Sequence, residues 1–129
     1  MQRPVSSVAI TNSAILIRIP RLYRAGMSEV ALYDATRGIW KIGDRRDNAK
    51  IALAVVNGLV VEAYEIHQWH RAGTTAYASG RKIDLAQASG RWEFTGKVAS
   101  AGTREKYLQR SVTEYFRKGP ANPIRYVNI

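Results

Sequence analysis

Two kinds of apolar pattern in the first half of the chain predict three strands. Residues 14–19 carry isoleucine at every second position, which is the two-residue period of a strand with a well-buried face. Residues 51–56 (IALAVV) are apolar without interruption, as in a central strand covered on both faces. Asn57 and Gly58 follow directly. Because both tolerate the positive φ angles of a type I′ turn, they predict a hairpin to a return strand over residues 59–66.

Strict alternation predicts another strand in the second half. Within residues 91–98 (RWEFTGKV), Trp92, Phe94 and Val98 fall on one face, and charged or polar side chains fall on the other. This pattern is typical of a half-buried antiparallel strand, and it predicts that Trp92 faces the core. Gly96 on the apolar face indicates a bulge or a close neighbour.

Capping signals predict a first helix over residues 29–37. Ser28 precedes it as an N-cap residue, because its hydroxyl can accept a free backbone N–H of the first turn. Met27 and Leu32 have the spacing of a hydrophobic staple. Gly38 stands just beyond the helix, where we expect the positive φ that glycine adopts at little cost.

A second helix is predicted from its N-cap at Thr103 to a stop at Gly119-Pro120. Four of its apolar residues recur at helical spacing and predict the buried stripe: Leu108, Val112, Tyr115 and Phe116. Residues 124–129 (IRYVNI) then predict a last strand that ends inside the sheet.

Two segments lack a clear period. Residues 67–91 are rich in Ala, Gly, Ser and Thr, and we interpret residues 72–80 as a long functional or mobile loop. Long irregular loops in compact domains often carry binding residues. Residues 83–88 have room for one turn of helix. Near the N-terminus, residues 5–10 are either a short additional strand or a loosely held arm.

The order of these elements predicts an α+β fold. Two main helices and five or six strands follow one another as βαββ…βαβ, which indicates a mixed barrel or curved sheet and not a doubly wound one. The 129 residues fall within the usual size of one domain, and they contain no repeat or linker. We therefore expect a single domain over residues 1–129, with residues 1–13 as an extra strand or a loose arm.

Composition adds a direction for function. Lys and Arg number 20 against 10 Asp and Glu, for a net charge of +10. Such a charge raises the local concentration of polyanions, so nucleic acid is the first partner that we expect. The alternative is that the charge only aids solubility.

The chain has no cysteine, which excludes disulfides, thiolate zinc sites and thiol nucleophiles and fits a reducing compartment. The first 20 residues are too polar and too short to span a bilayer, and they make a poor secretory signal. We expect a cytoplasmic protein that has no membrane partner.

Three passages, together with the order of elements, resemble the PUA-like superfamily of small pseudo-barrels, most closely its EVE/YTH and ASCH branches. These passages are ALYDATRGIWKIGDRR, the hairpin IALAVVNGLVVEAYEI leading into HQWHRAGTT, and GRWEFTGKV followed by a helix and a terminal strand. The resemblance covers nearly the whole chain. It implies a PUA-like mixed β pseudo-barrel of five or six strands with two main helices. Members bind RNA or DNA with modified bases, and the EVE and YTH branches hold a modified base in an aromatic pocket, so the resemblance implies a similar task here.

Trp40 and Trp69 are the candidate stacking aromatics, because cationic side chains lie beside each of them in the sequence. Stacking of a base on an aromatic ring contributes roughly 1–3 kcal/mol, and neighbouring cations neutralise phosphate. The alternative is that both are core residues, because tryptophan is highly buried on average. The predicted nucleic-acid-binding residues are Trp40, Lys41, Arg45, Arg46, Trp69, His70, Arg71, Thr74, Thr75 and Arg81.

Whether the charge forms one surface depends on the fold. The basic residues of the stretch 37–50 lie far in the sequence from Arg71, Arg81, Lys82 and Arg91. A fold that brings these onto one side produces a track for a nucleic-acid backbone. A fold that scatters them favours the solubility interpretation.

The titratable residues do not form a recognisable catalytic set. His67 and His70 are three residues apart, so they point to opposite faces of a strand, and a zinc site would need added carboxylates. Glu62 and Glu65 also fall on opposite faces. Asp44 and Asp47 flank two arginines, which favours local pairing.

We therefore expect no metal or cofactor, and a binding module more than an enzyme. Two alternatives stay open. One is a small metal-dependent nuclease or nucleotide hydrolase that uses the region of Glu62, Glu65 and Asp84. The other is a protein-interaction module.

Overall fold

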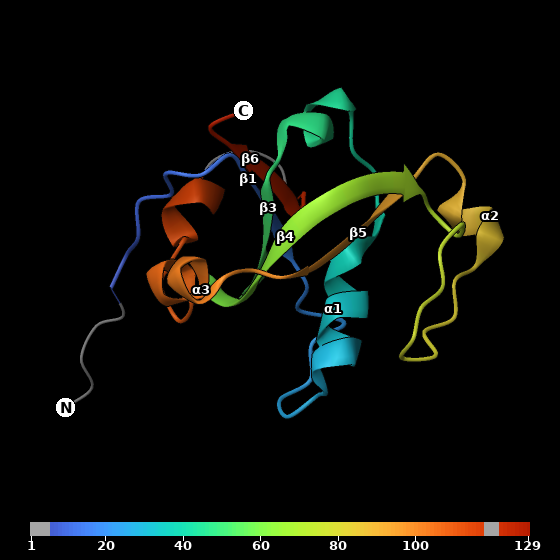
Figure 1. Cartoon of the computed structure of the whole chain (residues 1–129), viewed down its shortest axis with the longest axis horizontal. Helices are drawn as coiled ribbons and strands as arrows, with labels where there is room; N and C mark the ends of the chain where they lie inside the picture. The colour runs from blue at the N-terminus through green and yellow to red at the C-terminus, as the bar shows by residue number, and fades with distance from the viewer. Residues whose placement is uncertain (1–5, 118–121) are drawn as a thin grey trace.

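The computed structural model describes residues 6–117 and 122–129, and its centre is one curled sheet of six strands (Figure 1). The strands lie in the order β2–β5–β4–β3–β1–β6; β1 and β3 are parallel, and every other neighbouring pair is antiparallel. The strands are β1 Ala14–Arg18, β2 Gly38–Trp40, β3 Ile51–Val56, β4 Leu59–Arg71, β5 Trp92–Val98 and β6 Ile124–Val127. The α-helices are α1 Glu29–Arg37, α2 Leu85–Ala88 and α3 Ala101–Tyr107, and the 3₁₀ helices are η1 Asp44–Asn48 and η2 Thr113–Phe116. The predicted α+β class with a curved mixed sheet is confirmed.

The sheet has a core on each face, and β3 contributes to both. Leu53 and Val55 belong to one cluster of buried residues, which includes Tyr107 at the end of α3. Ala52 and Ala54 belong to the other, against which Leu32 of α1 packs. The uninterrupted apolar run of β3 is therefore explained, because successive side chains alternate between two dry faces.

The first helix begins and ends where the sequence predicts. The Ser28 hydroxyl accepts a hydrogen bond from the Ala31 backbone N–H at 3.1 Å. The prediction for Gly38 is wrong: its φ is −174°, an extended conformation that starts β2 opposite Glu93. A Cβ at this position would strike the Tyr77 hydroxyl and lie 2.9 Å from the Glu93 Cβ, so close packing and not a left-handed turn requires glycine here.

The predicted hairpin is confirmed, but its return strand is longer than expected. Asn57 and Gly58 both have positive φ, at 51° and 77°. β4 continues to Arg71 because β5 pairs with it over that length. A bulge falls where Ile66 pairs with Gly96 and the register then shifts; a Cβ on Gly96 would collide with the Glu65 carbonyl oxygen.

The second predicted helix is wrong in its start and its length. Ser100 caps α3 by accepting the Thr103 N–H at 3.3 Å, and the helix ends at Tyr107. The following backbone bonds to the hairpin instead: Gln109 N–H donates to the Val60 carbonyl at 2.8 Å, and Val112 N–H donates to that of Gly58 at 2.8 Å. The helix breaks because these bonds replace its own. The predicted stop at Gly119-Pro120 lies outside the described residues.

The structure also describes the N-terminal arm, the long loop and the last strand. Residues 6–10 form an arm held by an isolated bridge between Ser7 and Ser111, not a strand of the sheet. Residues 72–84 are irregular, and α2 supplies the expected turn of helix after them. The last predicted strand is confirmed as β6 over Ile124–Val127, but it ends two residues earlier than predicted and lies at the edge of the sheet, where it pairs with β1.

Candidate functional site

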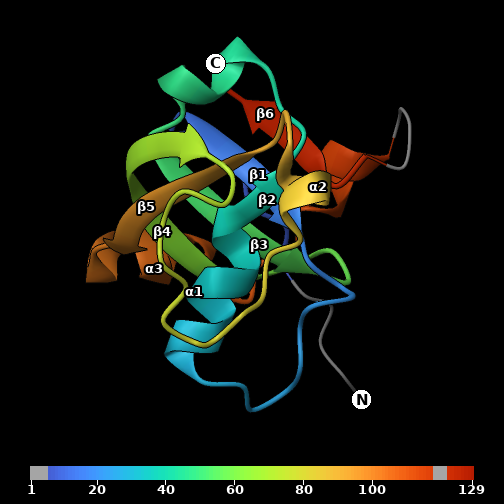
Figure 2. The ribbon, with the colours of Figure 1, turned by 90° about the vertical axis from the view of Figure 1, so that its right-hand side faces the viewer.

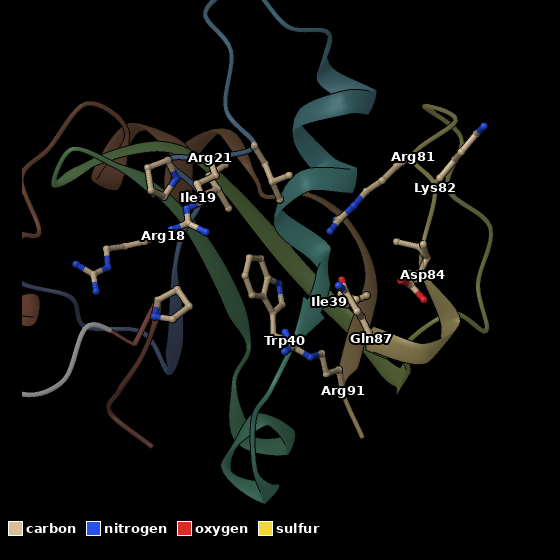
Figure 3. A pocket seen from close by; sticks show the side chains of 14 residues that line it. Arg18, Ile19, Arg21, Ile39, Trp40, Arg81, Lys82, Asp84, Gln87 and Arg91 are labelled. Atoms are coloured by element: carbon tan, nitrogen blue, oxygen red, sulfur yellow. The ribbon is translucent and has the colours of Figure 1, made fainter. Parts of the chain in front are cut away.

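A cavity of about 830 Å³ opens beside β2, within the range of about 300–1,000 Å³ typical of small-molecule sites (Figure 3). Four parts of the chain line it: the end of β1 with the turn after it, β2, the segment from Arg81 to Arg91, and Pro123 just before β6. The lining residues are Arg18, Ile19, Pro20, Arg21, Leu22, Ile39, Trp40, Arg81, Lys82, Ile83, Asp84, Gln87, Arg91 and Pro123. We call it the Trp40 pocket.

The curl of the sheet creates this pocket. β1 and β2 are separated in the sheet by three strands, so in a flat sheet their ends would lie far apart. Because the sheet curls, β2 and the α2 segment come across toward β1, as Figure 2 shows from the side. The pocket therefore joins residues that are distant in both the sequence and the strand order.

Trp40 lies in the middle of the pocket and is held in one orientation. Its indole Nε1–H donates to the Thr36 carbonyl oxygen at 2.7 Å, in the last turn of α1. The ring is partly buried and packs against the core cluster on the α1 face. A fixed indole that lines an open cavity is a ready stacking surface, since little side-chain entropy is lost when a ligand binds.

Positive charge dominates the pocket wall. In the part of the chain that the structure describes, five cationic side chains line it against one acid, and the acid is already engaged: the Asp84 carboxylate accepts the Ala86 N–H at 2.9 Å as the N-cap of α2. Among the described residues, the exposed side chains of Arg21, Lys82 and Arg91 make no hydrogen bond or ion pair. These unpartnered cations give the cavity a positive potential that an anionic ligand would neutralise.

Arg81 is the cation that the fold holds most firmly. Its guanidinium donates to the carbonyl oxygen of Asp34 at 2.6 Å and also to that of Gly38, so it is tied to the end of α1 and the start of β2. Burial lowers the pKa of Arg81, although an arginine side chain stays charged in a protein. Carbonyl partners carry no full charge, so the positive charge of Arg81 still contributes to the pocket.

Behind the pocket lies a group that we call the buried ionic cluster: Asp34, Arg37, Thr75, Tyr77 and Glu93. Fully buried Glu93 accepts hydrogen bonds from the Gly73 and Thr75 backbone N–H groups at 2.6 and 2.9 Å and from the Tyr77 hydroxyl at 3.0 Å. The Thr75 hydroxyl is a further donor. Burial by itself would raise the pKa of the Glu93 carboxyl, but these hydrogen bonds together hold that pKa below its ordinary value.

Arg37 completes the cluster and pins the long loop to α1. Its guanidinium lies 3.7 Å from a Glu93 carboxylate oxygen and 3.5 Å from one of Asp34. It also donates to the Thr75 hydroxyl at 2.7 Å and to the Ala76 carbonyl at 2.7 Å. Burial, with the nearby Glu93 carboxylate, raises the pKa of the Tyr77 hydroxyl. The cluster thus fixes residues 73–77 and, through them, the wall that continues to Arg81.

The structure places two of the predicted site residues in the Trp40 pocket and the other eight outside it. Trp40 and Arg81 both line the Trp40 pocket. Trp69 instead lines a smaller cavity of about 270 Å³ and packs edge-on against Phe94, with ring centroids 5.3 Å apart. The two candidate tryptophans therefore do not share a pocket.

Other predicted residues have structural contacts of their own. The Thr75 side chain belongs to the buried ionic cluster, and the Thr74 hydroxyl donates to the Arg71 carbonyl at 2.7 Å. His70 shares a hydrogen bond of 2.9 Å with the Thr95 hydroxyl. Lys41 is exposed outside the pocket.

The three remaining predicted arginines each lie over an aromatic ring. Arg46, 8% exposed, lies 3.5 Å from the centre of the Trp92 ring and near Asp44 and Asp47, so the local pairing predicted there is confirmed for Arg46. Arg71 also lies over Trp92, at 5.1 Å. Arg45 lies 4.6 Å from the Tyr126 ring. Trp92 is therefore a half-buried platform for arginines, and its expected place in the core is wrong.

Sequence reasoning missed Arg18, Arg21 and Gln87 as pocket residues. The sequence predicts Lys82 and Arg91 only as parts of a basic track that depends on the fold. They line the pocket together with Arg81, but the cations of residues 37–50 do not. The one local signal at Arg18 and Arg21 is a pair of cations around Pro20 at the end of a strand. This signal alone does not indicate a pocket, because only the curl of the sheet brings the two arginines close to β2.

No metal centre is evident in the described part of the chain: no three His, Asp or Glu side chains there are close enough to hold an ion. The acids of the nuclease alternative lie apart in structural roles. Glu62 is buried and accepts from Arg104 at 2.9 and 3.2 Å. Glu65 is exposed beside His67 and Lys97, and Asp84 caps α2.

Comparison with known proteins gives no relative: no family model, curated protein or solved structure matches the chain. Across residues 6–117 and 122–129, no helix combines the length and apolarity needed to cross a bilayer. The pocket itself is therefore the guide to function.

Proposed function

We propose that this chain is a nucleic-acid-binding module that holds one base of single-stranded RNA or DNA, or a base extruded from a duplex, against Trp40. The observation that carries the proposal is a fixed indole surrounded by five cationic side chains and one engaged acid. An aromatic surface with cations around it suits a base joined to phosphates, because the ring stacks and the cations neutralise the backbone. Extrusion costs a few kcal/mol, so single strands and weakened pairs should bind best.

The proposal includes membership of the PUA-like superfamily. The curled mixed sheet with α1 on one face supports it, since that is the architecture that the resemblance implies. Recognition of modified bases belongs to the same proposal. Trp40 is the one aromatic residue among the described residues that line the pocket, so it would provide a single stacking face and not a closed cage.

Fluorescence anisotropy with labelled single-stranded RNA and DNA, with and without methylated bases, tests the function. At low salt we expect binding that Trp40→Ala weakens by roughly 5- to 150-fold, the equivalent of about 1–3 kcal/mol of stacking. Trp40→Phe keeps an aromatic face and should keep most of the affinity. Absence of binding at low salt would contradict the proposed function. Binding that Trp40→Ala leaves unchanged would show that the Trp40 pocket is not the binding site.

Salt and metal titrations separate the two alternatives. Binding to nucleic acid should fall steeply as salt rises, because the bound phosphates release counterions. A protein-interaction module would instead keep its affinity for a partner chain at high salt. A nuclease would degrade the oligonucleotide in Mg²⁺ or Mn²⁺, whereas we expect the probe to stay intact.

A further inference from the structure

The cations of the Trp40 pocket come from two parts of the chain: in Figure 3, Arg18 and Arg21 lie on one side of Trp40, Arg81 and Lys82 lie on the other, and the Arg91 side chain reaches to just below Trp40. Arg18 and Arg21, at the end of β1 and in the turn after it, form what we call the strand wall. Arg81, Lys82 and Arg91, before and after α2, form the loop wall. Trp40 lies between the two walls.

Each wall keeps positive charge available for a ligand. In the described structure, exposed Arg21 on the strand wall has no hydrogen bond or ion pair, and the same is true of exposed Lys82 and Arg91 on the loop wall. Arg18 donates to the Asn122 carbonyl at 2.9 Å and lies over the Phe116 ring, 4.5 Å from its centre, so it is engaged by two groups that carry no net charge. Neither wall therefore contains a carboxylate that balances its charge, apart from Asp84, which is engaged at the N-terminus of α2.

A ligand that matches this arrangement carries a planar group with an anion on each side of it. A terminal nucleotide with one phosphate matches one wall only. A nucleotide within a strand has a phosphate on both its 5′ and its 3′ side, and it matches both walls.

We propose that the pocket takes an internal nucleotide, whose two flanking phosphates contact opposite walls while the base stacks on Trp40. The strand then runs across the pocket from one wall to the other. This inference rests on the proposed function and adds to it the part of the strand that is recognised.

Competition with small anions tests the inference directly. A labelled single-stranded oligonucleotide is bound to the protein and displaced by a nucleoside 5′-monophosphate, a 3′-monophosphate or a 3′,5′-bisphosphate. We expect the bisphosphate to compete roughly tenfold better than either monophosphate, the effect of about one added charge-assisted hydrogen bond. Equal competition by a monophosphate and the bisphosphate would overturn the inference.

Variants of single exposed cations assign the walls. Arg21→Ala should weaken competition by one of the two monophosphates roughly tenfold and leave competition by the other unchanged. Arg91→Ala should show the opposite preference. Both side chains are exposed and unpartnered, so neither change should disturb folding. Lys41→Ala, an equal loss of charge outside the pocket, should leave every competitor unchanged. If both wall variants weaken the same monophosphate, the two-walled arrangement is wrong.

The same experiment separates the two levels of the proposal. If the labelled oligonucleotide does not bind, or binds equally well to Trp40→Ala, the proposed function fails. If the oligonucleotide binds through Trp40 but the second phosphate gives no advantage, only the internal-nucleotide inference fails.

Discussion

Two arginine-bearing regions lie beside each other in this fold and differ in whether their charges have partners. In the buried ionic cluster, Arg37 contacts the carboxylates of Asp34 and Glu93 as well as two oxygens of the loop. Around the Trp40 pocket, Arg21 and Arg91 contact no acid in the described structure. In the first region the arginine is paired with carboxylates within the chain, although its Nε–H has no hydrogen-bond partner, and in the second Arg21 and Arg91 are left open to a ligand.

The difference shows why charge beside an aromatic residue in the sequence is a weak guide to a binding site. Arg46 is close in sequence to Trp40, yet it lies over Trp92 and next to two aspartates. Arg91 is far from Trp40 in sequence and lines its pocket. Arg46 has acidic partners within the chain, and Arg91 has none in the described structure.

The largest effect on stability should come from a change within the buried ionic cluster. Glu93→Gln removes the charge and turns an acceptor oxygen into an N–H donor facing other donors, while Arg37 loses a buried counter-charge. Loss of one partner from a buried ion pair costs about 3–5 kcal/mol, and we expect a destabilisation of that order in urea unfolding. Exposed Glu65→Gln, the matched control, should cost below about 1 kcal/mol. A loss below about 1 kcal/mol for Glu93→Gln would mean that the cluster does not hold the fold.

A smaller effect should follow when the cluster is crowded. In Gly38→Ala the new methyl group meets the Tyr77 hydroxyl and the Glu93 Cβ, and overpacking of this kind costs about 1–3 kcal/mol. Gly43→Ala is the control, because its φ is −99° and no atom lies within 4 Å of the added Cβ. Urea unfolding of the two variants measures the difference. Equal stabilities would show that β2 can move away from the loop.

The pH dependence of stability should show that the Glu93 carboxylate differs from ordinary surface acids. The folded pKa of Glu93 lies below its unfolded value, which is near 4.5, so folding favours the charged form. Its contribution is present above pH 4.5 and is lost as the pH falls through the folded pKa. We expect the unfolding free energy of the native chain to fall more steeply in acid than that of Glu93→Gln. Parallel curves would contradict the lowered pKa.

The smallest effect concerns the open region and its salt dependence. If Arg21 and Arg91 each contact one phosphate, replacing either by alanine should reduce the slope of log K against log salt by about 0.7 for a single strand. Titrations from low to moderate salt with one oligonucleotide measure this slope. An unchanged slope in both variants would show that neither cation reaches the backbone.

Local signals in the sequence predicted the parts of the fold that short-range interactions decide. The Ser28 cap and the Asn57-Gly58 turn act within a few residues, and both are found as predicted. The end of α3 depends instead on hydrogen bonds from Gln109 and Val112 to a hairpin some 50 residues earlier. The extra length of β4 was hidden because the bulge at Gly96 interrupts the alternation.

The candidate site was predictable only in its two members that sequence chemistry singled out, Trp40 and Arg81. Arg18 and Arg21 join them through a curl that brings β1 toward β2 across three strands. The residues near either arginine in the sequence give no sign that β1 and β2 come together. Conversely, Thr75 was expected to contact phosphate as a polar loop residue, but its contacts are with buried Glu93 and Arg37.

Two variants that lose the same charge show whether the Trp40 pocket or the net charge of the chain attracts the ligand. Anisotropy titrations of a labelled single strand at low salt would compare Arg91→Ala, in the pocket, with Lys41→Ala, outside it. Because Arg91 is an unpartnered cation beside Trp40, its loss should weaken binding roughly tenfold, whereas the loss of Lys41 should change affinity less than about twofold. Equal losses for the two variants would contradict the account, because net charge and not the Trp40 pocket would then attract the ligand.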